Sequence, residues 1–98
     1  MRVIAGSARG ARLDAPPGRD VRPIPDMARE ALFNLLRERI SGAVFLDLFA
    51  GAGTVGIEAL SRGAAGATFV DQSCGCVEAI RRNLAAARVE SFATTMSL

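Results

Sequence analysis

The stretch LDLFAGAGTVGIEALSRG, residues 46–63, constrains the fold more than any other part of the sequence. An apolar run over 43–49, interrupted only by Asp47, predicts a strand that is buried on both faces in a parallel sheet. Helical spacing after the glycines predicts a helix over 54–62 that ends at Gly63. The turn between strand and helix is expected at the glycines of the motif, Gly51, Gly53 and Gly56.

The residues after this helix repeat the same order of elements. The run ATFVD, residues 67–71, predicts a second strand, and residues 76–88 predict a second helix with one apolar face. The tail from residue 89 is compatible with either a third strand or a frayed end. Because a strand, a helix and a second strand form a right-handed βαβ unit, the sequence predicts an α/β fold with ligands outside the carboxyl ends of the strands.

A helix is also expected before the first strand. Asp26 is predicted to cap a helix over 27–40, with Arg29 and Glu30 on its polar side. Residues at spacings of three and four give the expected apolar face, namely Ala28, Ala31, Leu32, Leu35, Leu36 and Ile40.

Residues 1–24 are interpreted as a separate N-terminal segment. The prolines near its end predict an extended connector, because each disfavours helix at the residue before it. We therefore expect a basic hairpin and connector over 1–24 and the remaining domain over 25–98. The hairpin requires a turn with positive φ at Gly6 or Gly10, and its apolar residues are Val3, Ile4 and Leu13.

Charge is unevenly distributed along the chain. All 12 basic residues are arginine; residues 1–40 hold eight of them and five acids, a net charge of +3, whereas residues 41–98 hold four and five acids, a net charge of −1. The planar guanidinium group suits phosphate, so a basic leading segment fits nucleic acid, but a solvated arm is an alternative that charge alone leaves open. The arginines before the first expected helix are Arg2, Arg9, Arg12, Arg19 and Arg22.

Several classes of protein do not fit the composition. No apolar run reaches the roughly 18 residues that span a bilayer, and no apolar signal-peptide region opens the chain, so we expect a soluble, cytoplasmic protein without membrane contact. The chain has no histidine, and two cysteines, Cys74 and Cys76, are too few for a four-ligand zinc site within one chain. We expect no metal and two reduced thiols.

The glycine turn is compatible with two cofactor classes. Residues 51–56 read G-x-G-x-x-G, and Asp71 follows Gly51 by 20 residues. This spacing fits a dinucleotide site, in which a pyrophosphate meets the turn and the acid binds ribose hydroxyls. S-adenosylmethionine (SAM) also contains an adenosine whose ribose needs such an acceptor.

Asp47 favours SAM over a dinucleotide. At roughly 5 Å and an effective dielectric constant near 20, a carboxylate beside a phosphate is repelled by on the order of 3 kcal/mol before screening. SAM presents an ammonium and a sulfonium, which the same carboxylate attracts, and its own carboxylate can accept from the N–H groups of a helix N-terminus. A capping role for Asp47, with no ligand in the turn, is the structural alternative.

Several stretches in combination resemble a known family. RPIPDMAREALFNLL, LDLFAGAGTVGIEALSRGA and the opening MRVIAGSARGARLDAPPG are similar to RsmD-type methyltransferases, which use SAM to methylate the N2 amine of a guanine in bacterial 16S ribosomal RNA. The resemblance implies a class I SAM-dependent methyltransferase fold, which is Rossmann-like, with an N-terminal β-hairpin extension. It also implies ribosomal RNA or the small-subunit ribosomal particle as partner.

The resemblance implies roles for individual residues as well. Asp47 would lie near the methionine part of SAM, Asp71 would bind the ribose hydroxyls and Gln72 would border the adenine. The N-terminal hairpin with its arginines would contact RNA. The cofactor loop would consist of Phe49, Ala50, Gly51, Ala52 and Gly53.

The sequence departs from this family in two places. Ser73, Cys74, Gly75 and Cys76 stand where the family more often has charged residues. The catalytic motif of the family, Asp or Asn followed by Pro-Pro-Tyr or Pro-Pro-Phe, does not occur within the 98 residues, so no catalytic residue is assigned. We expect an incomplete fold that is the cofactor-binding part of a methyltransferase and is inactive alone.

Two other functions remain open, and the missing part of the sheet has one structural consequence. The alternatives are a non-catalytic SAM- or RNA-binding fragment and a dinucleotide-binding domain. In an incomplete sheet, the strand over 43–49 is an exposed apolar edge, which predicts self-association of the chain.

Overall fold

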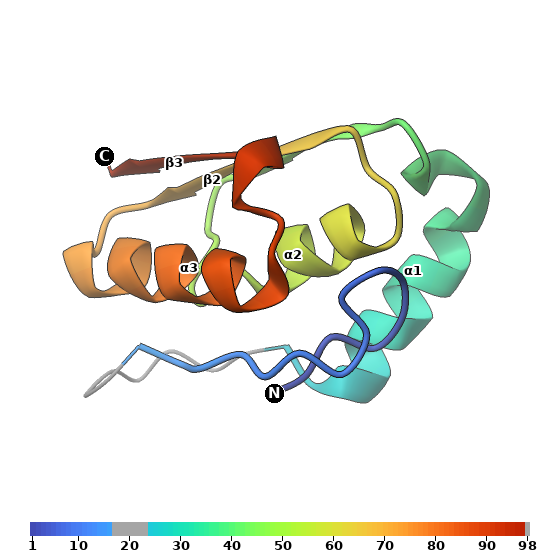
Figure 1. Cartoon of the computed structure of the whole chain (residues 1–98), viewed down its shortest axis with the longest axis horizontal. Coiled ribbons are helices and arrows are strands. Elements are labelled where there is room, and N and C mark those ends of the chain that lie inside the picture. Colours follow the sequence, from blue (N-terminus) through green and yellow to red (C-terminus); the bar gives the residue numbers. More distant parts are fainter. Residues whose placement is uncertain (17–23, 98) are drawn as a thin grey trace.

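The computed structural model describes residues 1–16 and 24–97 of the chain, which fold into a parallel sheet with helices (Figure 1). The prediction of an α/β fold is confirmed, and the tail forms a strand rather than a frayed end. In chain order the elements are α1 (Asp26–Ile40), β1 (Val44–Asp47), α2 (Thr54–Ser61), β2 (Gly66–Asp71), α3 (Cys74–Ala87), a 3₁₀ turn (Glu90–Phe92) and β3 (Ala93–Ser97).

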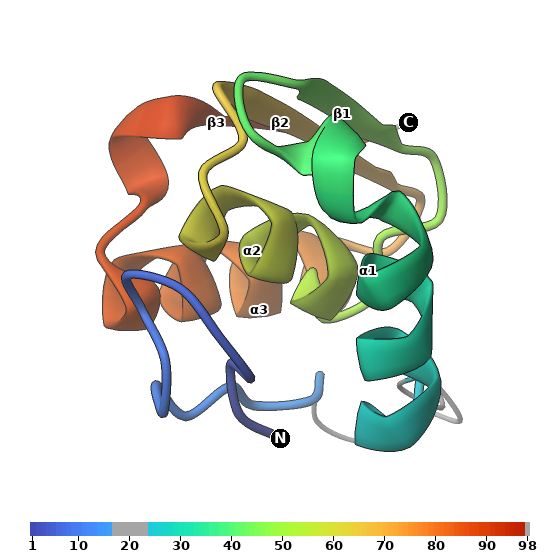
Figure 2. The same ribbon diagram turned by 90° about the vertical axis from the view of Figure 1, so that its right-hand side faces the viewer.

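The three strands are parallel and lie in the order β1-β2-β3, so β2 is the central strand and β1 is an outer strand with one unpaired side among the described residues. The register pairs Asp47 with Phe69 and Asp71 with Ser97, which brings the carboxyl ends of β1 and β2 to the same edge of the sheet. Figure 2 shows α2 and α3 on one face of the sheet and the N-terminal segment on the far side of these helices. The described part of the chain therefore has three layers: sheet, helices and N-terminal segment.

One face of the sheet is uncovered, which corrects the prediction that the strand over 43–49 is buried on both faces. Val44 is 77% exposed and Leu46 is 64% exposed, whereas Phe45, on the opposite face, is half-buried and its ring lies 6.4 Å from that of Phe33 in α1. The reason is topological, because both α2 and α3 pack on the same face. The strand is also shorter than predicted, since Leu48 and Phe49 belong to the turn.

The core lies between the helices and the covered face of the sheet. Phe69 of β2, Ile57 of α2 and Ile80 of α3 are all fully buried there. Gly56 was predicted in the turn but lies inside α2, where an added Cβ would stand 2.3 Å from the Phe69 ring. The third glycine of the motif therefore permits close packing of helix on strand.

Helix α1 buries a face that only partly matches the predicted one, since Ile40 is buried as expected. Arg29 and Phe33 are fully buried, whereas Leu35 is 86% exposed. Asp26 does not cap the helix; its carboxylate instead pairs with Arg29 at 3.1 Å inside the first turn. Arg29 is buried because it also lies 3.6 Å from the buried carboxylate of Glu58 in α2 and donates to the carbonyl of Arg2.

Residues 1–16 of the N-terminal segment form a narrow hairpin, in which the described residues make one bridge, between Arg2 and Arg12. Its two sides bury Val3 and Leu13, and positive φ, predicted at Gly6 or Gly10, is found at both. Arg19, Arg22 and most of the predicted connector lie outside the described residues. Within the described ranges, no helix combines the length and the apolar character needed to cross a membrane.

Buried polar side chains of α2 hold this segment in place through hydrogen bonds to its backbone. The Glu58 carboxylate accepts the N–H groups of Ile4 at 2.8 Å and Ala5 at 3.0 Å and also pairs with Arg62 at 2.8 Å. The Ser61 hydroxyl accepts the N–H of Ala8 at 2.9 Å and donates to the carbonyl of Ala5 at 2.7 Å. A buried carboxylate with this many donors is satisfied, so Glu58 contributes specificity to the docking of the segment.

We expect Gly6→Ala to destabilise the protein far more than Gly10→Ala. Both glycines have positive φ, which costs a residue with a Cβ about 1–2 kcal/mol. At Gly6 the new Cβ would also stand 1.9 Å from the carbonyl oxygen of Ser61, whereas at Gly10 it would meet no described atom within 4 Å. Overpacking then raises the cost of Gly6→Ala to about 3 kcal/mol or more.

Urea unfolding followed by circular dichroism measures both variants against the original chain. Equal losses of unfolding free energy in the two variants would show that the segment does not dock on α2 as described.

Candidate functional site

The turn between β1 and α2 is shaped by two glycines. Gly51 has φ of 57° and Gly53 has φ of 80°, values that residues with a Cβ rarely adopt. The Gly53 N–H donates to the carbonyl of Ala50 at 2.8 Å, and the Ala50 N–H donates to the carbonyl of Val70 in β2 at 3.1 Å. The turn is therefore tight and anchored to the central strand, and it leads directly into the N-terminus of α2.

Asp71 closes the site at the end of β2. One of its carboxylate oxygens accepts the Gly51 N–H at 3.0 Å, and the other accepts the Ser73 N–H at 3.0 Å. Burial acts to raise the pKa of Asp71, but hydrogen bonds led by those from Ser73 and Gly51 outweigh it and hold the pKa below its ordinary value. Asp71 is thus an ionised carboxylate that ties the glycine turn to the loop before α3.

Asp47 lies at the end of β1, and its pKa is shifted in the opposite direction to that of Asp71. Burial raises its pKa, against a hydrogen bond from the Phe49 N–H at 3.2 Å, and the nearby charge of Asp71 raises it further. Two carboxylates at one edge of the sheet repel each other, so the edge favours a cation.

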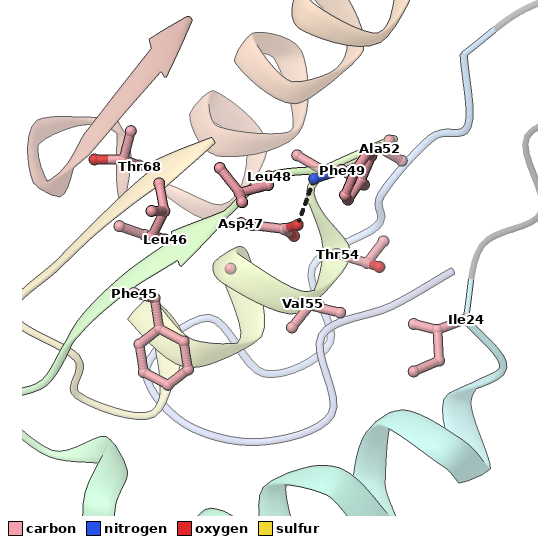
Figure 3. Close-up of a pocket in the computed structure, with 14 residues that line it drawn as sticks. Ile24, Phe45, Leu46, Asp47, Leu48, Phe49, Ala52, Thr54, Val55 and Thr68 are labelled. Atoms are coloured by element: carbon pink, nitrogen blue, oxygen red, sulfur yellow. Dashed lines mark hydrogen bonds between the residues drawn. The ribbon is translucent and has the colours of Figure 1, made fainter. Parts of the chain in front are cut away.

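Two hollows flank the turn. The larger, of about 530 Å³, extends from Asp47 along the turn to Thr54, Val55 and Ile24 (Figure 3). The smaller, of about 380 Å³, is lined by Leu48, Phe49, Val70, Asp71 and Gln72. The Phe49 side chain is 88% exposed and lines both, so it lies on the boundary between them.

The structure brings the predicted cofactor residues together. Asp47 ends β1, residues 49–53 form the turn, and Asp71 and Gln72 end β2 and follow it, all at one edge of the sheet. The predicted RNA-contacting residues Arg2, Arg9 and Arg12 are exposed on the N-terminal segment and line neither hollow.

Sequence reasoning missed some residues of the site. Ile24, Thr54 and Val55 line the larger hollow, and Asn83 of α3 donates to the carbonyl of Ala52 in the turn at 2.8 Å. The signal for Asn83 was a polar residue within the apolar stripe of a predicted helix. Across residues 1–16 and 24–97, no three Asp, Glu, Cys or His side chains are grouped closely enough to hold a metal.

The sequence is similar to those of proteins named as methyltransferases. Residues 1–97 match the family described as Conserved hypothetical protein 95. The chain is 45% identical over 85 residues to Ribosomal RNA small subunit methyltransferase D of Escherichia coli strain K12, a match that covers 87% of this chain and 43% of that protein.

Solved structures show the same fold. The structure of yhhF from Escherichia coli is 41% identical, with a TM-score of 0.88 over all of this chain and 52% of the other. A SAM-dependent methyltransferase from Thiobacillus denitrificans, solved with S-adenosyl-L-homocysteine, is 23% identical with a TM-score of 0.71, over 84% of this chain and 33% of that one. The fold is thus a partial class I methyltransferase fold, and the chain spans about half the length of the relatives that it matches.

We expect Asp47→Asn and Asp71→Asn to change stability in opposite directions at neutral pH. An aspartate whose pKa is raised on folding costs stability once ionised, so Asp47→Asn stabilises the unliganded chain, and the gain disappears as pH falls through the raised pKa. An aspartate whose pKa is lowered stabilises the fold above its unfolded pKa, so Asp71→Asn destabilises the chain at neutral pH by a small amount that solvent screening limits, and the loss vanishes in acid.

Urea midpoints between pH 3 and pH 8 measure both effects. Destabilisation by Asp47→Asn at neutral pH would contradict the electrostatic description of this edge.

Proposed function

Because the chain belongs to the Conserved hypothetical protein 95 family, that of the RsmD-type methyltransferases, we propose that it binds SAM at the glycine turn. The observation that carries the proposal is the pair of carboxylates, Asp47 and Asp71, on either side of a turn that opens a helix. A cationic sulfur compound with an adenosine group fits this arrangement of charge.

Each part of SAM has a complementary group at this edge. Asp47 attracts the ammonium and the sulfonium, and the SAM carboxylate accepts from the first N–H groups of α2, where no side chain among the described residues caps the helix. Asp71 accepts the ribose hydroxyls, since its carboxylate is only partly buried at the end of β2 and is held ionised by the surrounding hydrogen bonds. Gln72 borders the adenine in the smaller hollow.

A dinucleotide fits this site less well. Its pyrophosphate would meet the turn beside Asp47, whose carboxylate is partly buried and already repelled by Asp71. A second anionic group adds to that repulsion, whereas the ammonium of SAM relieves it.

The activity proposed for the whole protein is SAM-dependent methylation of small-subunit ribosomal RNA in the cytoplasm, at a guanine N2 amine as the family resemblance implies. This chain supplies the cofactor site, and no catalytic residue is assigned within it. A non-catalytic SAM- or RNA-binding role is the second candidate.

The N-terminal segment supports contact with RNA. Arg2 and Arg12 are directly opposite each other across the antiparallel bridge, and both are exposed. Like charges directly opposite each other are destabilising, and a phosphate between them would relieve the repulsion. We propose Arg2, Arg9 and Arg12 as RNA contacts, with Arg19 and Arg22 proposed on sequence alone.

Isothermal titration calorimetry with SAM, S-adenosylhomocysteine and NAD tests the cofactor. We expect both sulfur compounds to bind and NAD not to bind. Asp47→Ala and Asp71→Ala should each weaken SAM binding at least about tenfold, because each removes a charge-assisted contact. Glu78→Ala, at an exposed acid of α3, is the matched control and should leave the affinity unchanged. NAD binding that survives Asp47→Ala would support a dinucleotide site instead.

We also propose that the chain self-associates through β1. This strand is an edge, and the uncovered sheet face beside it exposes Val44, Leu46 and Leu48. Unpaired backbone groups beside an apolar face are a template for pairing with a second copy.

Light scattering after size exclusion tests this association. We expect assemblies larger than a monomer for the original chain and a monomer for Leu46→Lys, because a lysine on the uncovered face opposes the contact. Leu35→Lys is the matched control, since Leu35 is also an exposed leucine but lies on α1. A monodisperse monomer of the original chain at its highest soluble concentration would contradict the proposal.

A further inference from the structure

Asn83 in α3 is a buried amide with a complete set of partners. Its side chain is nearly inaccessible, with the residue 2% exposed. Its oxygen accepts the Asp14 N–H at 2.8 Å, and its nitrogen donates to the carbonyls of Asp14 at 2.9 Å and Ala52 at 2.8 Å. One side chain therefore joins two segments that are distant in the sequence.

These two segments are the two ligand surfaces of the proposed function. Ala52 lies between the two positive-φ glycines of the cofactor turn, so the direction of its carbonyl depends on the conformation of that turn. Asp14 lies two residues after Arg12, and Asn83 binds both of its backbone groups, as a neighbouring strand would. A shift of the N-terminal segment at Asp14 would therefore move the Asn83 side chain, and this movement would change its hydrogen bond to the Ala52 carbonyl in the turn.

The attachment of the N-terminal segment at Ser61 differs in this respect. Ser61 binds Ala5 and Ala8 near the end of α2, and none of its hydrogen bonds among the described residues reaches the cofactor turn. Ser61 and Asn83 therefore share the task of docking the segment, but only Asn83 also contacts the turn.

We propose that Asn83 is a positioning residue that couples RNA binding at the N-terminal segment to cofactor binding at the glycine turn. The inference rests on the proposed function for the identity of both ligands. When RNA fixes the segment, Asn83 holds the Ala52 carbonyl and the turn in the binding conformation, so each ligand binds more tightly in the presence of the other. Linkage requires the two enhancements to be equal.

The test measures the affinity of the chain for purified 16S ribosomal RNA by filter binding, with and without saturating S-adenosylhomocysteine. We expect the cofactor to tighten RNA binding by about fivefold or more in the original chain, the usual range for coupled sites. In Asn83→Ala the enhancement should fall to about one, because the bridge is cut. Ser61→Ala, which loosens the segment without contacting the turn, should keep the original enhancement.

A measurement on the unsubstituted chain guards against a failure of Asn83→Ala to fold. The side-chain amide resonance of Asn83 should shift on addition of S-adenosylhomocysteine alone and of RNA alone, although neither ligand can reach the buried group. Binding of both ligands with no mutual enhancement, or an enhancement that persists in Asn83→Ala, would overturn the coupling and leave the proposed function standing. Failure of S-adenosylhomocysteine to bind, or failure of both free 16S ribosomal RNA and the small-subunit ribosomal particle to bind, would overturn the proposed function itself.

Discussion

The Asp71 carboxylate is the interaction on which the candidate site depends. It accepts the N–H of Gly51 on one side and of Ser73 on the other, so a single side chain at the end of the central strand fixes the loops into both α2 and α3. The glycine turn can meet it only because Gly51 and Gly53 adopt positive φ. The register of β1 against β2 then places Asp47 at the same end of the sheet as this turn.

Helix α2 connects this site to the rest of the molecule. It has only eight residues; the glycine turn precedes it, and Glu58 and Ser61 near its other end hold the N-terminal segment. Its third glycine, Gly56, lets it pack directly on Phe69 of the central strand. Because this short helix lies between the sheet and the N-terminal segment, most of its residues are buried, and it cannot shift without disturbing both.

The order and type of the helices and strands could be predicted because they depend on the spacing of apolar residues and on the positions of glycines, both of which are local features of the sequence. The helix expected over 54–62 and the strand expected over 67–71 match α2 and β2 within one residue at each end. The buried faces could not be predicted as well, since burial depends on neighbours that the topology supplies. Leu46 is exposed because no described helix covers that face, and Arg29 is buried because Glu58 provides its counter-charge.

The same distinction applies to the site. Asp47 and Asp71 could be predicted to lie at the same side of the sheet, because each is near the carboxyl end of an apolar strand and parallel strands end at the same side. The role of Asn83 could not, because its partners Asp14 and Ala52 are 69 and 31 residues away in the sequence. A lone amide within an apolar helical stripe is the kind of residue whose partners only the tertiary structure identifies.

The bare face of the sheet has a thermodynamic consequence. Side chains such as Val44 and Leu46 are already hydrated in the folded chain, so unfolding adds little newly wetted hydrocarbon from that side. The heat capacity increment on melting is governed by that newly wetted area. An isolated chain of this architecture therefore has a shallow, broad stability curve, and covering the sheet with another polypeptide surface would sharpen it.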